Sequence, residues 1–579
     1  MRRSEAYAAL LLLTVAAFLA ASLVPYRVDT DTGFQLRSLQ QWTRGETPSP
    51  GTLRVPDAGD LSQDALVWSS WWPPGFPFLY APLAAAGLSL AATLRITSFL
   101  IFLAGTAGWM RLADRTELSR ATRLLFAVAL AAYALTLGGA ASLRSADNLS
   151  FAAAPWLILL VLRRDEPEPS YARLVLCGAA LGASYWLKYT LFVAALPLAA
   201  WLAVRLLLRE KSRGALALLR PAALGLGMVL PVIALIALNA AQSGDLAEST
   251  TGARSTWNAE DLASARPLSI ALGAAGAPGL ALFQSHLWIS HLVYFSDGRL
   301  PFLRTFDNPQ RLLLKSLLGL PGTAALLWGL WRARRDRGMS RLLALGLTAL
   351  GGFYVLLGAV SLAVEYNYPA NEPRFAAAVM PLLYPLLLAS WLTAARRQAP
   401  PLARTAALLA FVVFFLAPVA FATADFVRNE IGGRRAPAAA SSTGLYIPEI
   451  SPRDVPRVQA RIAGLLRSPR DVVVLAGPAG WGSSFMMWLE TPWRTLPVTT
   501  FCLPLGGRYV EAADLRASLP LTSSKPLRVV LVASLSLQER GWLSRLQARF
   551  PQARAWTPAA PVPGSNVGIW VSDLEVEAL

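Results

Sequence analysis

Residues 171–213 read YARLVLCGAALGASYWLKYTLFVAALPLAAWLAVRLLLREKSR. Two apolar runs, 173–187 and 190–207, are separated only by Lys188 and Tyr189, and arginines bound the pair on its outer flanks. Each run approaches the roughly 20 residues that an α-helix needs to cross about 30 Å of hydrocarbon. The stretch therefore predicts two membrane-spanning helices that meet at a short polar tip.

The composition of the whole chain agrees with this stretch. Of 579 residues, 55% are apolar and 15% charged, and the mean hydropathy of +0.44 lies outside the range of ordinary soluble proteins. The net charge of +18 comes from Lys and Arg clustered between apolar runs, which favours a lipid bilayer and not nucleic acid as the partner. Two cysteines and two histidines supply neither a disulfide framework nor a zinc motif.

Eleven spans are predicted. The first, 8–24, follows Arg2 and Arg3 and lacks a cleavage site, which places the N-terminus in the cytoplasm. The others lie near 93–110, 122–140, 149–162, 173–187, 190–207, 220–240, 312–331, 342–363, 375–394 and 405–423. This count places five basic segments in the cytoplasm, Arg111–Arg123, Arg163–Arg173, Arg205–Arg220, Arg332–Arg341 and Arg396–Arg404. We expect a polytopic α-helical protein of a bacterial inner membrane, with its C-terminus in the periplasm or outside the cell.

Two further apolar stretches, 71–91 and 267–283, are not counted as spans. Either one would move a basic segment to the outer side, against the charge rule. Prolines also interrupt both stretches, for example Pro77 and Pro278, so we expect helices that rest on or dip into the outer interface.

The remaining segments define the domain organisation. A transmembrane domain, 1–425, carries outer loops 26–92 and 242–310, and residues 426–579 follow as a periplasmic linker and a small α/β domain. Strand-like runs 471–475, 528–532 and 567–571, separated by polar stretches, indicate the α/β character of that domain.

The first outer loop opens with two carboxylates, Asp29 and Asp31, directly after the first span. A carboxylate held at the interface could deprotonate an acceptor hydroxyl, aided by an acidic neighbour and partial burial that raise its pKa. The alternative is a turn that caps a helix over Phe34–Thr43. The spacing alone leaves both readings open.

Other candidate residues lie on the same side. Asp147, in a short outer turn, is a candidate catalytic residue or a helix N-cap. Lys188 is a candidate for binding a lipid phosphate beside Tyr189, or a lysine that snorkels to water. A cluster before the tenth span adds the candidate substrate-binding and phosphate-binding residues Glu365, Tyr366, Glu372 and Arg374.

Together these residues resemble a known family, the membrane glycosyltransferases of the GT-C fold, in the branch of the protein O-mannosyltransferases and the bacterial lipid A aminoarabinose transferase. The resemblance covers roughly residues 5–425. It rests on the order and common outer location of Asp31, Gln35, Leu39, Trp42, 45–48 (GETP), 73–77 (PPGFP), Asp147, 187–189 (LKY), 373–375 (PRF), Met380 and Pro381.

The resemblance implies inverting transfer of a sugar from a polyprenyl-phosphate carrier to an acceptor, a glycan, lipid or protein, at the outer face. Asp31 would be the base; Thr32 departs from the acidic pair usual in the family, and Asp29 would replace the missing carboxylate. Asp147 matches a second acidic position, and Lys188 and Arg374 match cations near the carrier phosphate. The resemblance implies no cofactor, assigns no metal ligand and leaves a divalent cation open.

Two other functions compete with transfer. A transporter or flippase would need charged or broken helices along a path through the membrane. A non-catalytic assembly protein would keep the fold and bind lipid carriers without turning them over.

Overall fold

The computed structural model describes the helical N-terminal half of the chain, parts of the last spans and most of the C-terminal sheet. The described residues are 3–24, 26–28, 30–43, 45, 52–57, 60–68, 72–115, 119–137, 142–143, 146–164, 169–243, 271, 275–276, 320–321, 323–324, 327–328, 331, 400–416, 419–420, 423–424, 426–428, 445–446, 455–476, 494–498, 503–505, 508–510, 523–534, 557–558 and 567–574.

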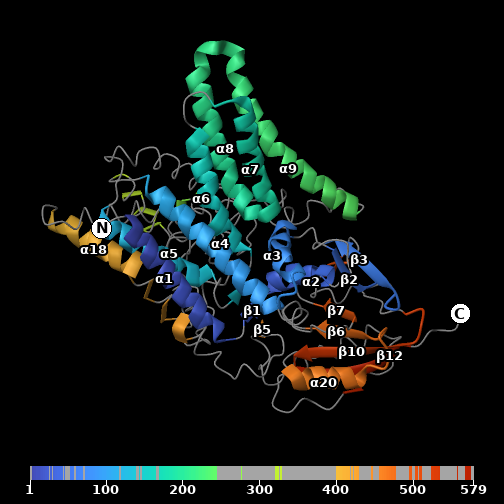
Figure 1. Cartoon of the computed structure of the whole chain (residues 1–579). Helices are drawn as coiled ribbons and strands as arrows, with labels where there is room; N and C mark the ends of the chain where they lie inside the picture. The colour runs from blue at the N-terminus through green and yellow to red at the C-terminus, as the bar shows by residue number, and fades with distance from the viewer. Residues whose placement is uncertain are drawn as a thin grey trace.

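The first seven predicted spans are helices in the structure (Figure 1). They are α1 (Arg3–Ser22), α4 (Leu90–Ala113), α5 (Arg120–Leu137), α6 (Asp147–Arg164), α7 (Tyr171–Leu187), α8 (Tyr189–Glu210) and α9 (Leu219–Ser243). A 3-10 helix, η1 (Lys211–Leu218), joins α8 to α9, and α18 (Pro401–Phe411) with the π-helical η6 (Val412–Leu416) falls in the predicted last span.

Within the described part of the chain, four helical stretches are long and apolar enough to cross a membrane: Glu5–Ser22, Leu90–Ala113, Tyr189–Glu210 and Gly214–Gln242. The predicted multi-pass helical membrane protein is therefore confirmed. The total of eleven spans stays a prediction, because 342–363 and 375–394 lie outside the described residues.

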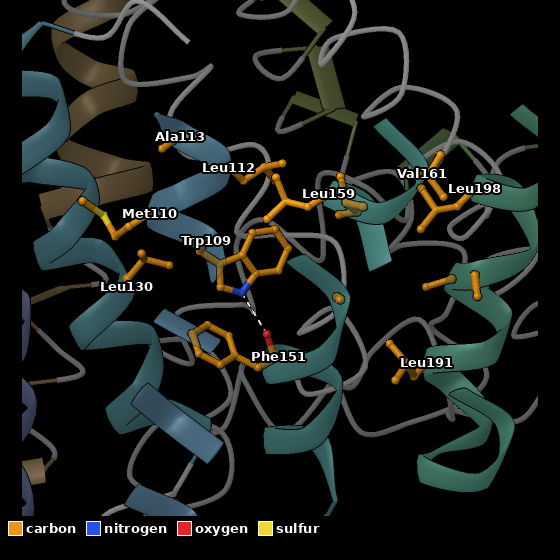
Figure 2. Close-up of a cluster of buried hydrophobic side chains, with 14 of the residues drawn as sticks. Trp109, Met110, Leu112, Ala113, Leu130, Phe151, Leu159, Val161, Leu191 and Leu198 are labelled. Carbon is orange, nitrogen blue, oxygen red and sulfur yellow. Dashed lines mark hydrogen bonds between the residues drawn. The ribbon is translucent and has the colours of Figure 1, made fainter. Parts of the chain in front are cut away.

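A buried aromatic cluster holds α4 against α6 (Figure 2). The Trp109 indole Nε1 donates a 2.9 Å hydrogen bond to the Phe151 carbonyl oxygen, and Phe102 stacks on Phe151 with ring centroids 5.2 Å apart. A buried indole N–H needs such a partner. The contact fixes the height of α6 along α4 and hence the position of Asp147, the first residue of α6.

Helices α7 and α9 pack so closely that glycine is required between them. A Cβ atom on Gly182 would overlap the Met228 carbonyl oxygen, and one on Gly227 would overlap the carbonyl oxygen of Val175. Backbone contact of this kind is common between membrane helices, where small residues let the two helices approach.

Residues 26–92, the predicted first outer loop, contain β1 (Tyr26–Val28), α2 (Thr30–Thr43), the hairpin of β2 (Thr52–Pro56) and β3 (Asp64–Trp68), and α3 (Gly75–Ala85). Helix α2 begins at Thr30, one turn before the expected start at Phe34, so the predicted start of this helix is corrected and Thr30, Asp31 and Thr32 lie in its first turn. Helix α3 has 11 residues and is about 16 Å long, too short to cross the hydrocarbon. This agrees with the prediction that 71–91 is not a span.

A small parallel sheet gathers three distant segments. Strand β1 lies between β4 (Ser142–Leu143) and β5 (Leu445–Tyr446), and pairs with both in parallel. These strands follow α1, join α5 to α6, and open the C-terminal part. All three segments were predicted to share one side of the membrane, and they meet at one end of the helix bundle.

A polar cluster links the start of α1 to the end of α4 and the start of α5. The Tyr7 hydroxyl donates a 2.8 Å hydrogen bond to Asp114, and the Arg123 guanidinium lies 3.5 Å from the same carboxylate. Arg120 pairs with Glu5 at 3.7 Å. This is the grouping expected for the predicted cytoplasmic side.

The C-terminal part forms a mixed five-stranded sheet in the order β11-β12-β10-β6-β7. Its elements are α20 (Val455–Leu465), β6 (Val472–Ala476), β7 (Arg494–Val498), β10 (Leu527–Ser534), β11 (Thr557–Pro558) and β12 (Val567–Leu574), with a separate hairpin of β8 (Leu503–Leu505) and β9 (Arg508–Val510). The three predicted strand runs correspond to β6, β10 and β12.

The C-terminal sheet shares one hydrophobic cluster with the first outer loop. Figure 1 shows β6, β7, β10 and β12 on the side of α2 and α3 that faces away from α7, α8 and α9. The shared cluster includes Leu36, Leu39, Phe76, Tyr80, Val458, Ile462, Val473, Val530 and Ile569. Burial of apolar area across this contact stabilises the position of α2.

Candidate active site

The strongest candidate site centres on an ion pair between Asp147 and Lys188. The two side chains are 3% and 14% exposed, so both charges are largely removed from water. A buried charge destabilises the fold unless it is paired, and removing one member of a pair leaves the other charge buried without a partner. Two residues that the sequence singled out separately therefore form one unit.

Local backbone structure explains how the pair forms. Lys188 lies between α7 and α8 with extended dihedrals, φ −164° and ψ 135°, so the chain turns there without continuing the helix. Asp147 is the first residue of α6. Instead of snorkelling to water, the Lys188 side chain reaches the carboxylate of Asp147.

A chain of uncharged polar groups continues from Asn148. Its side-chain nitrogen donates to the Tyr80 hydroxyl at 3.4 Å. The Ser98 hydroxyl lies 3.4 Å from that of Tyr80 and 3.3 Å from that of Tyr26. Four elements, α3, α4, α6 and β1, thereby meet in one buried network.

Tyr80 has no role as a proton acceptor at ordinary pH. Burial raises the pKa of Tyr80 to about 12, although its hydrogen bonds with Ser98 and Asn148 act in the opposite direction. Its hydroxyl stays neutral and fixes α3 beside α4 and α6.

The backbone brings the segment of Asp31 beside that of Asp147. In the parallel pair of β1 and β4, Val28 is opposite Leu143. Asp31 follows Val28 by three residues as the second residue of α2, and Asp147 follows Leu143 by four as the first residue of α6. Parallel neighbours are about 4.8 Å apart and run in one direction, so the chain enters α2 and α6 from adjacent strands.

Tyr189 is held by two neighbours in the adjacent helices. Its ring lies 4.7 Å from that of Tyr185, and its hydroxyl hydrogen-bonds the Asn239 side chain. Asn239 also accepts a 2.7 Å hydrogen bond from the indole of Trp68. Residues next to Lys188 are thus tied to the first outer loop.

The other predicted site residues, Asp29, Glu365, Tyr366, Glu372 and Arg374, lie outside the described residues. Their roles stay predictions. Across the described part of the chain, no three His, Cys, Asp or Glu side chains form a group that could hold a metal ion.

Sequence reasoning missed Tyr80, Ser98 and Asn148. One signal was present in α4, where the polar residues Thr93, Thr97 and Ser98 occur in a mainly apolar helix and are all buried. Polar residues within a membrane helix usually face other protein groups. The partner of each could not be read from the sequence.

No family model matches the sequence, and no curated protein matches it. Among solved structures, the chain is similar to ArnT from Cupriavidus metallidurans bound to undecaprenyl phosphate, with 15% identity, 98% of this chain and 97% of that chain covered, and a TM-score of 0.46. It is also similar to the arabinofuranosyltransferase AftD from Mycobacteria, with 13% identity, 98% of this chain and 40% of that chain covered, and a TM-score of 0.43. A third match is the Archaeoglobus fulgidus oligosaccharyltransferase, with 12% identity, 97% of this chain and 74% of that chain covered, and a TM-score of 0.45.

These three proteins are glycosyltransferases of the GT-C fold, the family that the sequence motifs resemble. At these identities and TM-scores, neither substrates nor residue roles are carried over from them.

Proposed function

We propose that this protein is a membrane glycosyltransferase that moves a sugar from a polyprenyl-phosphate donor to an acceptor at the outer face of a bacterial inner membrane. The observation that carries the proposal is the buried pair of Asp147 and Lys188. It lies at the end of the helix bundle where the segments that we predict to be outside the membrane gather. A lysine there meets the phosphate of a carrier whose polyprenyl tail remains in the bilayer.

The chemistry needs few protein groups. Polyprenyl phosphate leaves as an already stabilised anion, so the enzyme supplies positive charge for the phosphate and a base for the acceptor hydroxyl. In this proposal Lys188 and Arg374 bind the phosphate and Asp147 holds Lys188 in place. Asp31 removes the acceptor proton, Asp29 supports it, and attack opposite the leaving phosphate inverts the anomeric carbon.

The proposal assigns the remaining parts as follows. Residues 1–425 form the transmembrane domain, and 426–579 form a periplasmic linker and α/β domain. Glu365, Tyr366, Glu372 and Tyr189 contribute to substrate binding. The acceptor is a glycan, lipid or protein. No organic cofactor takes part, and a requirement for a divalent cation stays open.

The distribution of charge supports transfer over transport. In the described helices α1 and α4–α9, charged side chains lie within the first or last two turns. Arg95, the deepest of them in α4, donates to the carbonyl oxygens of Ala21 and Val24 at the end of α1. A transport path would call for charges near the middle of the membrane.

Turnover tests the proposal. The purified protein in lipid nanodiscs is incubated with a panel of polyprenyl-phosphate sugars labelled in the sugar, together with outer-face material from spheroplasts as acceptor. We expect label to leave the donor lipid and enter an acceptor fraction. Donor that binds without turnover would indicate an assembly protein, and donor that crosses the bilayer intact would indicate a flippase.

The Asp31→Asn variant assigns the base. General-base assistance contributes about 10²–10⁴ in rate, so we expect less than about 10% residual transfer, with donor binding and thermal stability unchanged. Asp29→Asn should reduce transfer less. Loss of activity in Asp29→Asn alone would move the base to Asp29, and activity in both variants would make Asp147 the candidate.

A further inference from the structure

The hairpin formed by β2 (Thr52–Pro56) and β3 (Asp64–Trp68) contacts both the C-terminal sheet and the helices α2 and α9. One arginine of the sheet fastens it. The Arg494 guanidinium donates to the Asp64 carboxylate at 2.7 Å and to the Gln63 carbonyl oxygen at 2.6 Å. Its third bond, 2.7 Å to the Arg470 carbonyl oxygen, stays within the C-terminal part.

Arg494 is well placed to act as a rigid anchor. Its side chain is 14% exposed, and all three guanidinium nitrogens have a partner. The planar fork of arginine fixes direction as well as charge. The hairpin is thereby held at a defined position on the edge strand β7.

A second contact supports the same junction. The Asp60 carboxylate accepts hydrogen bonds from the Ser62 amide at 2.9 Å and from the Ser524 amide at 3.0 Å. The hydroxyls of these two serines lie 2.7 Å apart. The turn of the hairpin is therefore bound to the segment that precedes β10.

The hairpin in turn holds α2. The Gln41 side-chain amide bonds the backbone of Arg54 twice: its nitrogen donates to the carbonyl oxygen at 3.0 Å, and its oxygen accepts from the amide at 2.9 Å. Gln41 is 3% exposed. This two-point contact joins β2 to the helix that carries Asp31.

The other end of the hairpin reaches the opposite part of the site. Trp68, the last residue of β3, donates to Asn239 of α9, which also bonds Tyr189, the neighbour of Lys188. One rigid hairpin thus touches both the helix of the proposed base and the helices beside the proposed phosphate cation.

We propose that Arg494 is a positioning residue for sugar transfer: it anchors the hairpin to the C-terminal sheet and thereby fixes α2 relative to the bound donor. The C-terminal sheet then has a defined role, as a support for the active site. The part of this inference that concerns catalysis rests on the proposed function, whereas the mechanical coupling of Arg494 to α2 does not.

The test compares Arg494→Gln with a matched control, Arg528→Gln. Arg528 is 15% exposed, and its guanidinium makes a two-point contact with Asp573 at 2.8 and 3.0 Å and a third to the Leu465 carbonyl oxygen at 3.4 Å. All these partners belong to the C-terminal part. Both variants weaken that part, but only Arg494→Gln releases the hairpin.

Two measurements are made on the full-length variants in nanodiscs. Hydrogen exchange should speed up in residues 30–43 for Arg494→Gln and remain at the wild-type rate for Arg528→Gln. Transfer per donor-binding site should fall on the order of ten- to hundredfold in Arg494→Gln, as for a small misplacement of a reacting group, with the KM for donor unchanged. Counting donor-binding sites removes any loss of folded protein from the comparison.

A third variant follows the coupling one step further. Gln41→Ala breaks the contact between hairpin and α2 without touching the sheet, so it should reproduce both effects, and the double variant with Arg494→Gln should add little. Additive effects, or wild-type exchange in 30–43 with Arg494→Gln, would overturn the inference. If wild-type protein transfers no sugar but exchange in 30–43 still responds, the proposed function fails and the coupling stands.

Discussion

The sharpest test of the proposed donor site separates two roles of Lys188, the ion pair with Asp147 and the proposed contact with the carrier phosphate. Lys188→Met leaves the Asp147 carboxylate, 3% exposed, without its partner. Removing one member of a buried ion pair costs about 3–5 kcal/mol. Asp147→Asn should cost less, because the long Lys188 side chain can move its ammonium toward water.

The double variant Lys188→Met, Asp147→Asn leaves no unpaired charge. We expect it to recover most of the stability, measured as the midpoint of thermal unfolding in nanodiscs. If Lys188 also binds the carrier phosphate, donor affinity should remain low in the double variant. The missing charge-assisted contact is worth roughly 1.5–3 kcal/mol, or about ten- to hundredfold in Kd.

A second ion pair serves as the control. Glu210, the last residue of α8, pairs with Arg220 at the start of α9, and the two side chains are 7% and 16% exposed. This pair lies at the end of α8 that is far from Lys188. Arg220→Met should therefore lower stability like Lys188→Met but leave binding of a polyprenyl-phosphate sugar unchanged. Recovery of donor affinity together with stability in the Lys188, Asp147 double variant would refute a phosphate role for Lys188 and leave the pair a purely structural one.

Three further predictions concern packing, pH and topology. Gly182→Ala should lower stability by about 1–3 kcal/mol in thermal unfolding, because the added methyl group overlaps the Met228 carbonyl oxygen; unchanged stability would mean that α7 and α9 are farther apart. Burial raises the pKa of Asp60, but hydrogen bonds from Ser62 and Ser524 outweigh it and lower the pKa from 3.8 to about 2. Ionised Asp60 therefore stabilises the hairpin contact above about pH 4, and this contribution is lost as the pH falls through 2. Hydrogen exchange in 523–534 should rise over that interval in the wild-type protein. The Asp60→Asn variant should not show this pH dependence. A reporter fused after Gly444 should be active only outside the cytoplasm, and a cytoplasmic signal would contradict the count of eleven spans.

The sequence predicted the helices well because their signal is local. A long apolar run identifies a membrane helix wherever it packs, and α4, α8 and α9 follow their predicted ranges closely. The strands β6, β10 and β12 were also visible as short β-branched runs. The start of α2 was harder, since polar residues such as Thr30 and Thr32 fit a turn as well as a first helical turn.

The candidate site was predictable as residue types but not as contacts. Asp147 and Lys188 each drew attention as charges beside apolar runs, yet their pairing depends on how α6 approaches the turn between α7 and α8. Nothing in the sequence around Arg494 indicated that this residue contacts the hairpin. Its partner Asp64 is 430 positions away in the chain, and such a pair arises only when the whole fold brings two surface segments together.

The small parallel sheet has a consequence for the biogenesis of the protein. Strand β1 is made at the start of synthesis, whereas its neighbour β5 exists only after residues 29–444 have been added. At about 5–20 residues per second, this interval is on the order of 20–80 s. One edge of β1 stays unpaired during this interval, so the sheet that precedes α2 is incomplete in the nascent chain. A fragment truncated at residue 425 would remain in that unfinished state permanently.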